Sequence, residues 1–213
     1  MIQLHYFPGN ANFAPHIMLE EIGVPHELVL VDRANNGHKT PGYLKLNPTG
    51  RIPVMVDGDF VLYESAAICL HLSDCHPEAG LAPALGTQER AQMYKWLMYL
   101  TNTLQAEVLT YHYTARYQPV ADAVPAAKAL SEEKLGGMFD LIEAELADGR
   151  TWVAGDFFSI ADIYLFMNAR FCRMIGNPPK TRPNLKRLLD AVAARPATIR
   201  AGEAEGLAAP YYA

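Results

Sequence analysis

The sequence predicts an α/β domain followed by an all-helical domain. Strand and helix signals alternate over the first eighty residues, and no convincing strand pattern occurs later in the chain. Between the two regions lies the Pro/Gly-rich stretch HPEAGLAP, which is typical of a linker. We therefore assign residues 1–80 to the α/β domain and residues 87–213 to an all-α bundle domain.

The α/β domain has the predicted order β-α-β-α-β-β-α. Strands are expected at 2–6, 27–31, 54–56 and 60–62, with helices at 15–22, just after Thr40, and from Ser65 onward. A strand, a helix and a second strand imply a parallel pair with a right-handed crossover, and the Asp57-Gly58 hairpin adds antiparallel strands. This order predicts a thioredoxin-like layout.

The second domain is predicted to contain four long helices, at about 87–117, 125–147, 159–175 and 184–194. The third has the clearest start, because Ser159-Ile160-Ala161-Asp162 has the pattern of a capping box. We interpret it as a folding signal without a catalytic role.

Composition and charge exclude several classes of function. The 213 residues carry a formal net charge of −5 and no extended basic block, which argues against a general nucleic-acid binder. No apolar run is long enough to span a bilayer, and the first residues do not resemble a secretory signal. Three irregularly spaced cysteines do not form a disulfide framework, so we expect a reducing cytosolic compartment.

The stretch RIPVMVDGDFVLYES contains a candidate binding site. Pro53 stands where the first hairpin strand begins, although proline cannot donate a hydrogen bond to a strand ladder. Ser65 stands where a helix N-cap is expected, and its hydroxyl with the following N–H groups would attract an anion. From these residues alone, a plain N-cap beside a solvated Glu64 is about as plausible as a ligand site.

Four segments together resemble the glutathione transferase superfamily. They are the opening MIQLHYFPGNANFAPHIMLEEIG, the stretch NPTGRIPVMVDGDFVLYESAAI, the Pro-rich linker, and GDFFSIADIYL. The resemblance spans nearly the whole chain. It implies a cytosolic, homodimeric detoxification enzyme that uses glutathione as co-substrate and an apolar electrophile bound between its two domains.

The resemblance also implies how glutathione would bind. The Ile52–Pro53 peptide bond should be cis, and the Ile52 backbone should pair with the cysteinyl part of glutathione. Ser65 and its helix terminus suit the γ-glutamyl carboxylate, and Glu64 suits the ammonium group. A cation in the loop before the short helix would hold the glycyl carboxylate, and we favour Lys39 over His38 for this role.

At the residue that would stabilise the thiolate, this chain departs from the bacterial beta-class members that it resembles. Those carry a cysteine in a PGxCS pattern, where PGNAN here has Ala11, and Gln105 replaces their helical histidine. A mixed disulfide at this position is therefore not expected. The remaining side-chain donors, with the asparagines placed slightly ahead of the tyrosine, are Asn10, Asn12 and Tyr6.

The acceptor pocket is assigned to three aromatic residues, although core or dimer packing would suit the two helical tyrosines about as well. They are Phe13, Tyr113 and Tyr117. A second cluster could hold a metal, but its position on an apolar helix face and a helix end argues against this, and we expect no metal. Its members are Cys69, His71 and Cys75.

The function that we predict is conjugation of the glutathione thiolate to a small apolar electrophile. One alternative is glutathione-dependent reduction of disulfides or peroxides, with a second glutathione in place of the missing cysteine. Another is a non-catalytic adaptor, against which the intact Ile52-Pro53 and Glu64-Ser65 pairs argue. The expected partners are glutathione, the electrophile and a second copy of the chain, without nucleic acid or membrane.

Overall fold

The computed structural model describes residues 1–213 and divides them into two compact units. The sheet unit comprises Met1–Ala82 and Ala194–Tyr211, and the helical unit comprises Pro83–Ala193 and Tyr212–Ala213. An α/β part and an all-helical part are therefore present, as predicted. The division differs from the predicted 87–213 domain because the last helix groups with the sheet.

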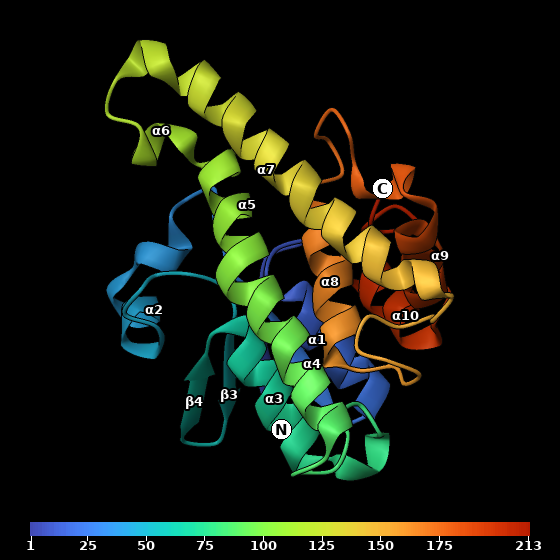
Figure 1. Cartoon of the computed structure of the whole chain (residues 1–213). Helices are drawn as coiled ribbons and strands as arrows, with labels where there is room; N and C mark the ends of the chain where they lie inside the picture. Colours follow the sequence, from blue (N-terminus) through green and yellow to red (C-terminus); the bar gives the residue numbers. More distant parts are fainter. The chain divides into compact units, whose positions relative to one another are not determined.

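The sheet has four strands in the order β2-β1-β3-β4, namely β1 (Ile2–Tyr6), β2 (His26–Leu30), β3 (Val54–Asp57) and β4 (Phe60–Tyr63). The hairpin of β3 and β4 is labelled in Figure 1. Strands β1 and β2 are parallel, while β3 is antiparallel to both β1 and β4. Leu4 pairs with Met55 on one face, and both are almost completely buried. This mixed sheet confirms the predicted thioredoxin-like layout.

Four helices belong to the sheet unit: α1 (Phe13–Ile22), α2 (Pro41–Leu46), α3 (Ser65–Cys75) and α10 (Pro196–Ala204). Helix α1 packs against α3 and α10. Helix α2 begins just after Thr40, as predicted, and the Thr40 hydroxyl caps it by accepting a hydrogen bond from the Tyr43 N–H. Helix α10 was not predicted, because the last expected helix ends at about residue 194. Pro196 occupies the first turn of α10, a position that proline tolerates.

The helical unit is formed by α4 (Gln88–Met98), the π-helical segment η3 (Tyr99–Leu104), α5 (Gln105–His112), α6 (Thr114–Tyr117), α7 (Val124–Glu145), α8 (Ile160–Phe171) and α9 (Pro183–Ala193). Helices α5 and α7 lie side by side, and α8 contacts both α4 and α9 (Figure 1). The predicted helix at 87–117 is not continuous, since Tyr113 leaves the helical region with φ −121° and ψ 32°.

The predicted capping box at the start of α8 is present. The Asp162 carboxylate accepts hydrogen bonds from the Ser159 N–H at 2.9 Å and from the Val153 N–H at 2.8 Å. The Ser159 hydroxyl in turn accepts from the Ala161 N–H at 3.2 Å. Asp162 is completely buried, so this box ties the preceding loop to the centre of the helical unit.

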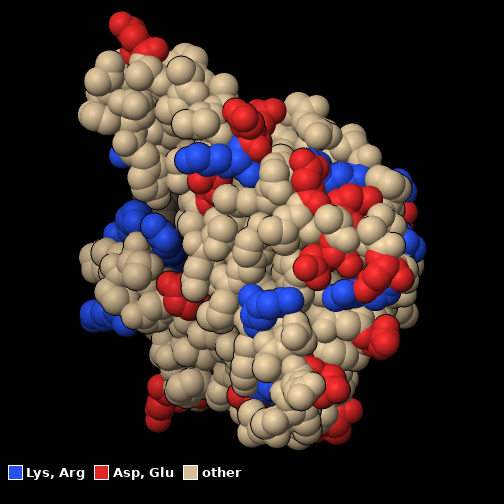
Figure 2. Space-filling view, in the orientation of Figure 1, with Lys and Arg blue, Asp and Glu red and all other residues tan.

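The surface charge agrees with the sequence analysis. On the face in Figure 2, basic and acidic side chains are interspersed rather than gathered into one extended basic surface. No helix combines the length and apolar character that crossing a membrane would require.

Candidate functional site

Strand register brings the predicted binding residues to one end of the sheet. Tyr6 ends β1, and the antiparallel pairing of His5 with Val54 places the start of β3 at the same end. Val54 also pairs with Tyr63, the last residue of β4. The residues that flank these strands, Pro53 and Glu64, therefore lie at the end of the sheet where the turn after β1 begins.

Ile52 presents free backbone groups at this end. The Ile52–Pro53 bond is cis, which confirms the expectation from the resemblance. Ile52 precedes β3 and its N–H and C=O have no backbone partner in the chain. These groups are therefore available to an extended ligand, as at a strand edge.

The loop before Ile52 is held by Asn47, a residue that the sequence analysis did not assign to the site. The Asn47 amide donates to the Arg51 carbonyl at 2.9 Å, and its oxygen accepts from the Thr49 N–H at 3.0 Å. The Tyr43 hydroxyl donates to the same Arg51 carbonyl at 2.8 Å. Asn47 is buried, and the Asn-Pro turn was the only available signal of its role.

Ser65 and Glu64 are each displaced by one position from the predicted capping arrangement. Helix α3 begins at Ser65, so Glu64 rather than Ser65 occupies the N-cap position. Glu64 has φ +76°, a conformation that is uncommon for a residue with a Cβ. Its exposed carboxylate makes no hydrogen bond to cap the helix.

The start of α3 nevertheless has the features of an anion site. The Ser65 side chain is largely buried, and its hydroxyl has no protein partner. The first N–H that is bonded within the helix is that of Ile68, so the N–H groups before it are free to bind a ligand. A carboxylate at this position would meet aligned donors, with the Glu64 carboxylate beside them.

Lys39 is held against the segment that leads to Ile52. Its ammonium group donates to the Gly50 carbonyl at 3.1 Å and lies 3.4 Å from the Thr49 carbonyl. Gly50 has φ +60°, and a Cβ there would approach the Lys39 nitrogen to 2.6 Å. His38 is a poorer cation, because burial and the neighbouring Lys39 and Arg33 lower the pKa of its imidazole.

The two asparagines of the turn after β1 have different environments. Asn12 is completely buried; its oxygen accepts from the Phe7 N–H at 3.1 Å and its amide donates to Glu205 at 2.8 Å. Both the oxygen and the amide of Asn12, a predicted thiolate donor, therefore already have partners within the chain. Asn10 is partly exposed, and only its oxygen is bonded, to the Ala11 N–H at 2.7 Å.

Tyr6 also remains available as a donor. Its side chain is half-buried at the end of β1, and its hydroxyl has no hydrogen-bond partner in the chain. Asn10 and Tyr6 are thus the two predicted donors that keep a free N–H or O–H beside the turn.

Glu205, just after α10, is the residue of this turn that sequence reasoning missed. Its buried carboxylate accepts from the Gly9 N–H at 2.7 Å, the Asn12 amide at 2.8 Å and the His16 ring at 2.8 Å. One acidic group therefore fixes the turn between β1 and α1. No local pattern could have indicated it, because Gly9 and Glu205 are 196 positions apart.

The three aromatic residues assigned to an acceptor pocket differ in burial and in the helix to which they belong. Phe13, a predicted wall of the acceptor pocket, is the first residue of α1 and is completely buried in the core. Tyr113 follows α5 and lies under the Arg116 guanidinium, 4.3 Å from its ring centroid. Tyr117 ends the separate helix α6 and is largely exposed, so the two tyrosines do not lie on one continuous helix.

Gln105, Cys69 and Cys75 have separate surroundings. Gln105 accepts a hydrogen bond from the Tyr164 hydroxyl at 2.6 Å within the helical unit. Cys69 is buried, and burial raises the pKa of its thiol, whereas Cys75 is exposed 3.6 Å from the His71 ring. The structure thus does not bring Cys69, His71 and Cys75 together as one cluster.

Comparisons with known proteins show the family of the chain. Residues 14–75 match the family model for the glutathione S-transferase N-terminal domain, and residues 125–196 match that for the C-terminal domain. Glutathione S-transferase GST-4.5 of Xanthomonas campestris pv. campestris is 30% identical over 175 residues, covering 82% of this chain and 84% of the relative.

Solved structures are similar over nearly the full length. A sphingomonad glutathione S-transferase complexed with glutathione has a TM-score of 0.83 and 33% identity, with 97% of this chain and 100% of the other covered. A glutathione transferase homologue from Sulfitobacter with bound glutathione has a TM-score of 0.88 and 27% identity, with 98% and 99% covered. The fold is thus that of a thioredoxin-like domain followed by a helical domain. The chain belongs to the glutathione transferase superfamily, and it is a glutathione transferase.

Proposed function

We propose that this enzyme conjugates the thiolate of glutathione to a small apolar electrophile in a detoxification reaction. The observation that carries the proposal is the set of unpaired groups at one end of the sheet. These groups are the Ile52 backbone, the Ser65 hydroxyl with the start of α3, and the Glu64 carboxylate. Their chemistry matches the peptide backbone, carboxylate and ammonium of glutathione.

In this arrangement each part of glutathione has a partner. The Ile52 N–H and C=O pair with the cysteinyl backbone, which directs the thiol toward the turn after β1. Ser65 and the positive end of α3 bind the γ-glutamyl carboxylate, while Glu64 binds the ammonium group. Lys39 binds the glycyl carboxylate, and in doing so would exchange its contact with the Gly50 carbonyl for a charged partner.

The chemistry requires that the thiol lose its proton, because the thiolate is the nucleophile. We assign stabilisation of S⁻ to the Asn10 amide and the Tyr6 hydroxyl, assisted by the N-terminus of α1. The thiolate sulfur then forms a bond to an electrophilic carbon, and the leaving group departs with the electron pair of the broken bond. Tyr113 and Tyr117 remain proposed contacts of the electrophile.

Asn10→Ala should raise the apparent pKa of enzyme-bound glutathione by about one unit, because one hydrogen bond to the thiolate is lost. We expect kcat/KM at neutral pH to fall about tenfold for Asn10→Ala and less for Tyr6→Phe. The measurement is the pH profile of kcat/KM with a chromogenic electrophile, with the glutathione affinity as control. If neither variant shifts the profile, backbone N–H groups rather than these side chains hold the thiolate.

Ser65→Ala and Glu64→Gln should each weaken glutathione binding roughly 10- to 100-fold, since each removes a hydrogen bond to a charged group. Calorimetry with glutathione and with Cys-Gly, which lacks the γ-glutamyl group, tests this. The wild type should prefer glutathione, and both variants should lose most of that preference. An unchanged preference would place the γ-glutamyl group elsewhere.

Ala11, which stands where beta-class relatives have a cysteine, affects the alternative reaction, the reduction of disulfides or peroxides. Without a cysteine in the turn, reduction of a disulfide or peroxide would need two glutathione molecules in succession. Assays with a disulfide substrate and with an aryl halide distinguish the two reactions; conjugation should be the faster.

We further propose a cytosolic homodimer, which light scattering of the purified chain would show as twice the 23.5 kDa chain mass.

A further inference from the structure

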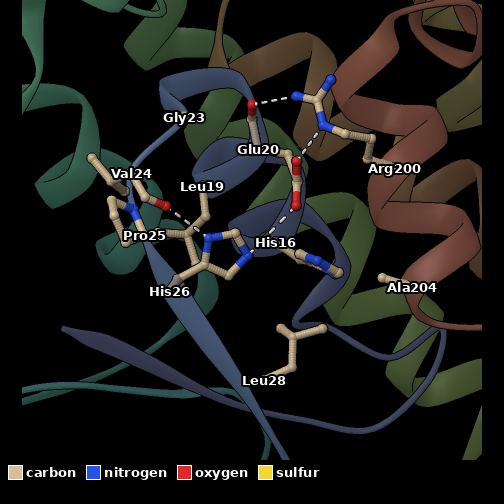
Figure 3. Close-up of a pocket in the computed structure, with 10 residues that line it drawn as sticks. All are labelled: His16, Leu19, Glu20, Gly23, Val24, Pro25, His26, Leu28, Arg200 and Ala204. Atoms are coloured by element: carbon tan, nitrogen blue, oxygen red, sulfur yellow. Dashed lines mark hydrogen bonds and ion pairs between the residues drawn. The ribbon is translucent and has the colours of Figure 1, made fainter.

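A pocket of about 560 Å³ lies at the start of β2, between α1 and α10 (Figure 3). It is formed within the sheet unit, and its polar lining comes from His16, Glu20, His26 and Arg200. His26 begins β2 and pairs with Ile2, whereas the candidate glutathione site is at the other end of these strands. The pocket is therefore distinct from the site described above.

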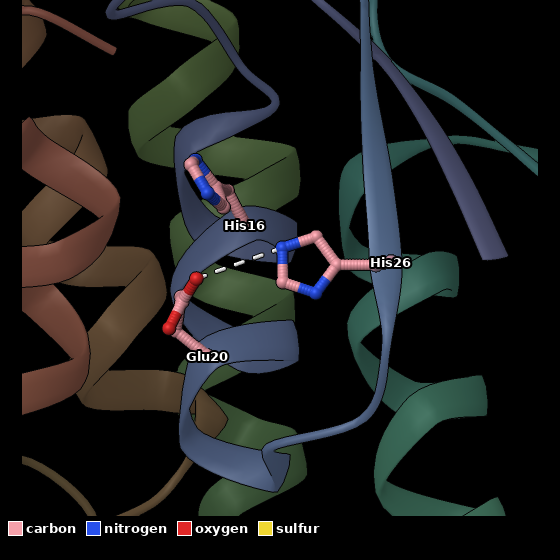
Figure 4. A group of neighbouring side chains, drawn as sticks. All are labelled: His16, Glu20 and His26. Carbon is pink, nitrogen blue, oxygen red and sulfur yellow. Dashed lines mark ion pairs between the residues drawn. The ribbon is translucent and has the colours of Figure 1, made fainter. Parts of the chain in front are cut away.

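Three potential metal ligands converge on this pocket. His16 and Glu20 are four residues apart on α1 and so share one helix face, and His26 faces them from β2 (Figure 4). One ligand atom from each of the three side chains lies within 4.8 Å of the other two. His26 Nε2 and Glu20 Oε1 are already only 3.6 Å apart.

Hydrogen bonds orient both histidine rings in the way that metal sites require. His26 Nδ1 bonds to the Val24 carbonyl at 3.0 Å, and His16 Nδ1 bonds to the Glu205 carboxylate at 2.8 Å. Both partners are acceptors, so Nδ1 of each ring is the nitrogen placed to donate to them, and Nε2 is the nitrogen left to bind a metal ion. A carbonyl or carboxylate behind a ligating histidine is the usual outer partner in metal sites.

His16 supplies a further observation that points to a ligand. Its side chain is completely buried, and its Nε2 has no hydrogen-bond partner in the chain. Buried ring nitrogens are normally bonded, so this atom lacks the partner that its position calls for. A metal ion at the pocket wall would provide one.

Arg200 holds the Glu20 carboxylate so that one of its oxygens stays free to bind a metal ion. Its Oε2 accepts from Arg200 Nε at 2.5 Å, and Arg200 also donates to the Glu20 carbonyl at 2.8 Å. This leaves Oε1 directed toward His26 (Figure 3). Arg200 thus fixes the carboxylate and offsets its charge without occupying the oxygen nearest the histidines.

We propose that His16, Glu20 and His26 form a binding site for a divalent transition-metal ion, with zinc as the best match. Two imidazoles and one carboxylate are a donor set that zinc favours, and three protein ligands leave a fourth position open to the pocket. Zinc–ligand bonds of about 2.0–2.2 Å require the three ligand atoms to draw together by small side-chain rotations. The expectation of no metal, which rested on Cys69, His71 and Cys75, did not consider these residues.

The test is titration of the untagged, metal-free full chain with Zn²⁺ in competition with a chromogenic chelator, without glutathione. We expect one ion per chain, and Co²⁺ should give the visible absorption of a four-coordinate site. Glu20→Gln and His26→Ala should each lower the affinity at least about tenfold. Zn²⁺ should raise the melting temperature of the wild type and not that of either variant.

The matched control replaces a histidine–cysteine pair outside the proposed site, His71→Ala with Cys75→Ser, and should bind Zn²⁺ as the wild type does. Absence of binding to the wild type would overturn the proposal, as would tight binding that survives in both Glu20→Gln and His26→Ala. Loss of binding in the His71→Ala, Cys75→Ser control would also overturn it. Because glutathione is absent throughout, these outcomes are independent of the proposed transferase reaction.

Discussion

Replacing Glu205 with alanine should cost about 3–5 kcal/mol of the free energy of unfolding and reduce kcat/KM on the order of 100-fold. The Glu205 carboxylate is the common acceptor for the Gly9 N–H, the Asn12 amide and the His16 ring. Alanine leaves these donors buried without a partner. The turn that carries Asn10 would then lose its fixed position relative to the thiol.

Two further variants make this prediction specific. Glu205→Gln keeps the shape and one acceptor oxygen, so its effects should be intermediate. Glu203→Ala, at an exposed position near the end of α10, should change stability by less than about 0.5 kcal/mol and leave turnover unchanged. Urea unfolding and steady-state kinetics measure both quantities. Wild-type behaviour of Glu205→Ala would mean that the backbone alone holds the turn.

Asp162→Ala should destabilise the chain by about 3–5 kcal/mol, the second large effect that we expect. The Asp162 carboxylate accepts from the Val153 N–H, the Ser159 N–H and the Ser159 hydroxyl, all in a completely buried position. Removing it leaves these donors without a partner and opens a cavity at the start of α8. Asp156→Ala, an exposed acid in the same loop, is the control and should be nearly neutral.

Asp162 should also make stability depend on pH. Burial raises its pKa to about 7 from an ordinary value of 3.8, although its hydrogen bonds oppose this shift. Because the folded-state pKa is the higher one, the protonated acid favours folding, and this contribution is lost as the pH rises through about 7. The free energy of unfolding, measured with urea, should therefore fall as the pH rises from about 4 to about 7, between the pKa values of the unfolded and folded states. Asp162→Asn should remove the part of this pH dependence that Asp162 causes. An identical slope in Asp162→Asn would show that other groups cause it.

The parts of the fold that depend on local sequence were predictable. The DG hairpin, the Thr40 cap and the capping box at Ser159 each rest on residues a few positions apart, and the structure contains all three. Helix α10 was missed because Pro196 is compatible with either a stop or a first helical turn. The sequence therefore specified elements better than it specified where each one begins or packs.

The candidate site was predictable only in part, for a physical reason. Ile52-Pro53 and Glu64-Ser65 are marked by a hairpin that fixes their separation, so pattern and resemblance both point to them. Asn12 looked like a free donor because its partner, Glu205, comes from a distant helix. Long-range hydrogen bonds decide which polar residues of a turn are available to a ligand, and a single sequence does not show them.

The hydrogen bonds from the turn after β1 to Glu205 have a consequence for folding during translation. Gly9 and Glu205 are 196 positions apart. At a translation rate of roughly 5–20 residues per second, Glu205 is therefore synthesised roughly 10–40 seconds after Gly9. During that interval the nascent sheet lacks α10, and the buried donors of the turn have only water as a partner. A chain released before α10 would therefore contain every residue proposed to contact glutathione. It would, however, hold the turn between β1 and α1 in no single conformation.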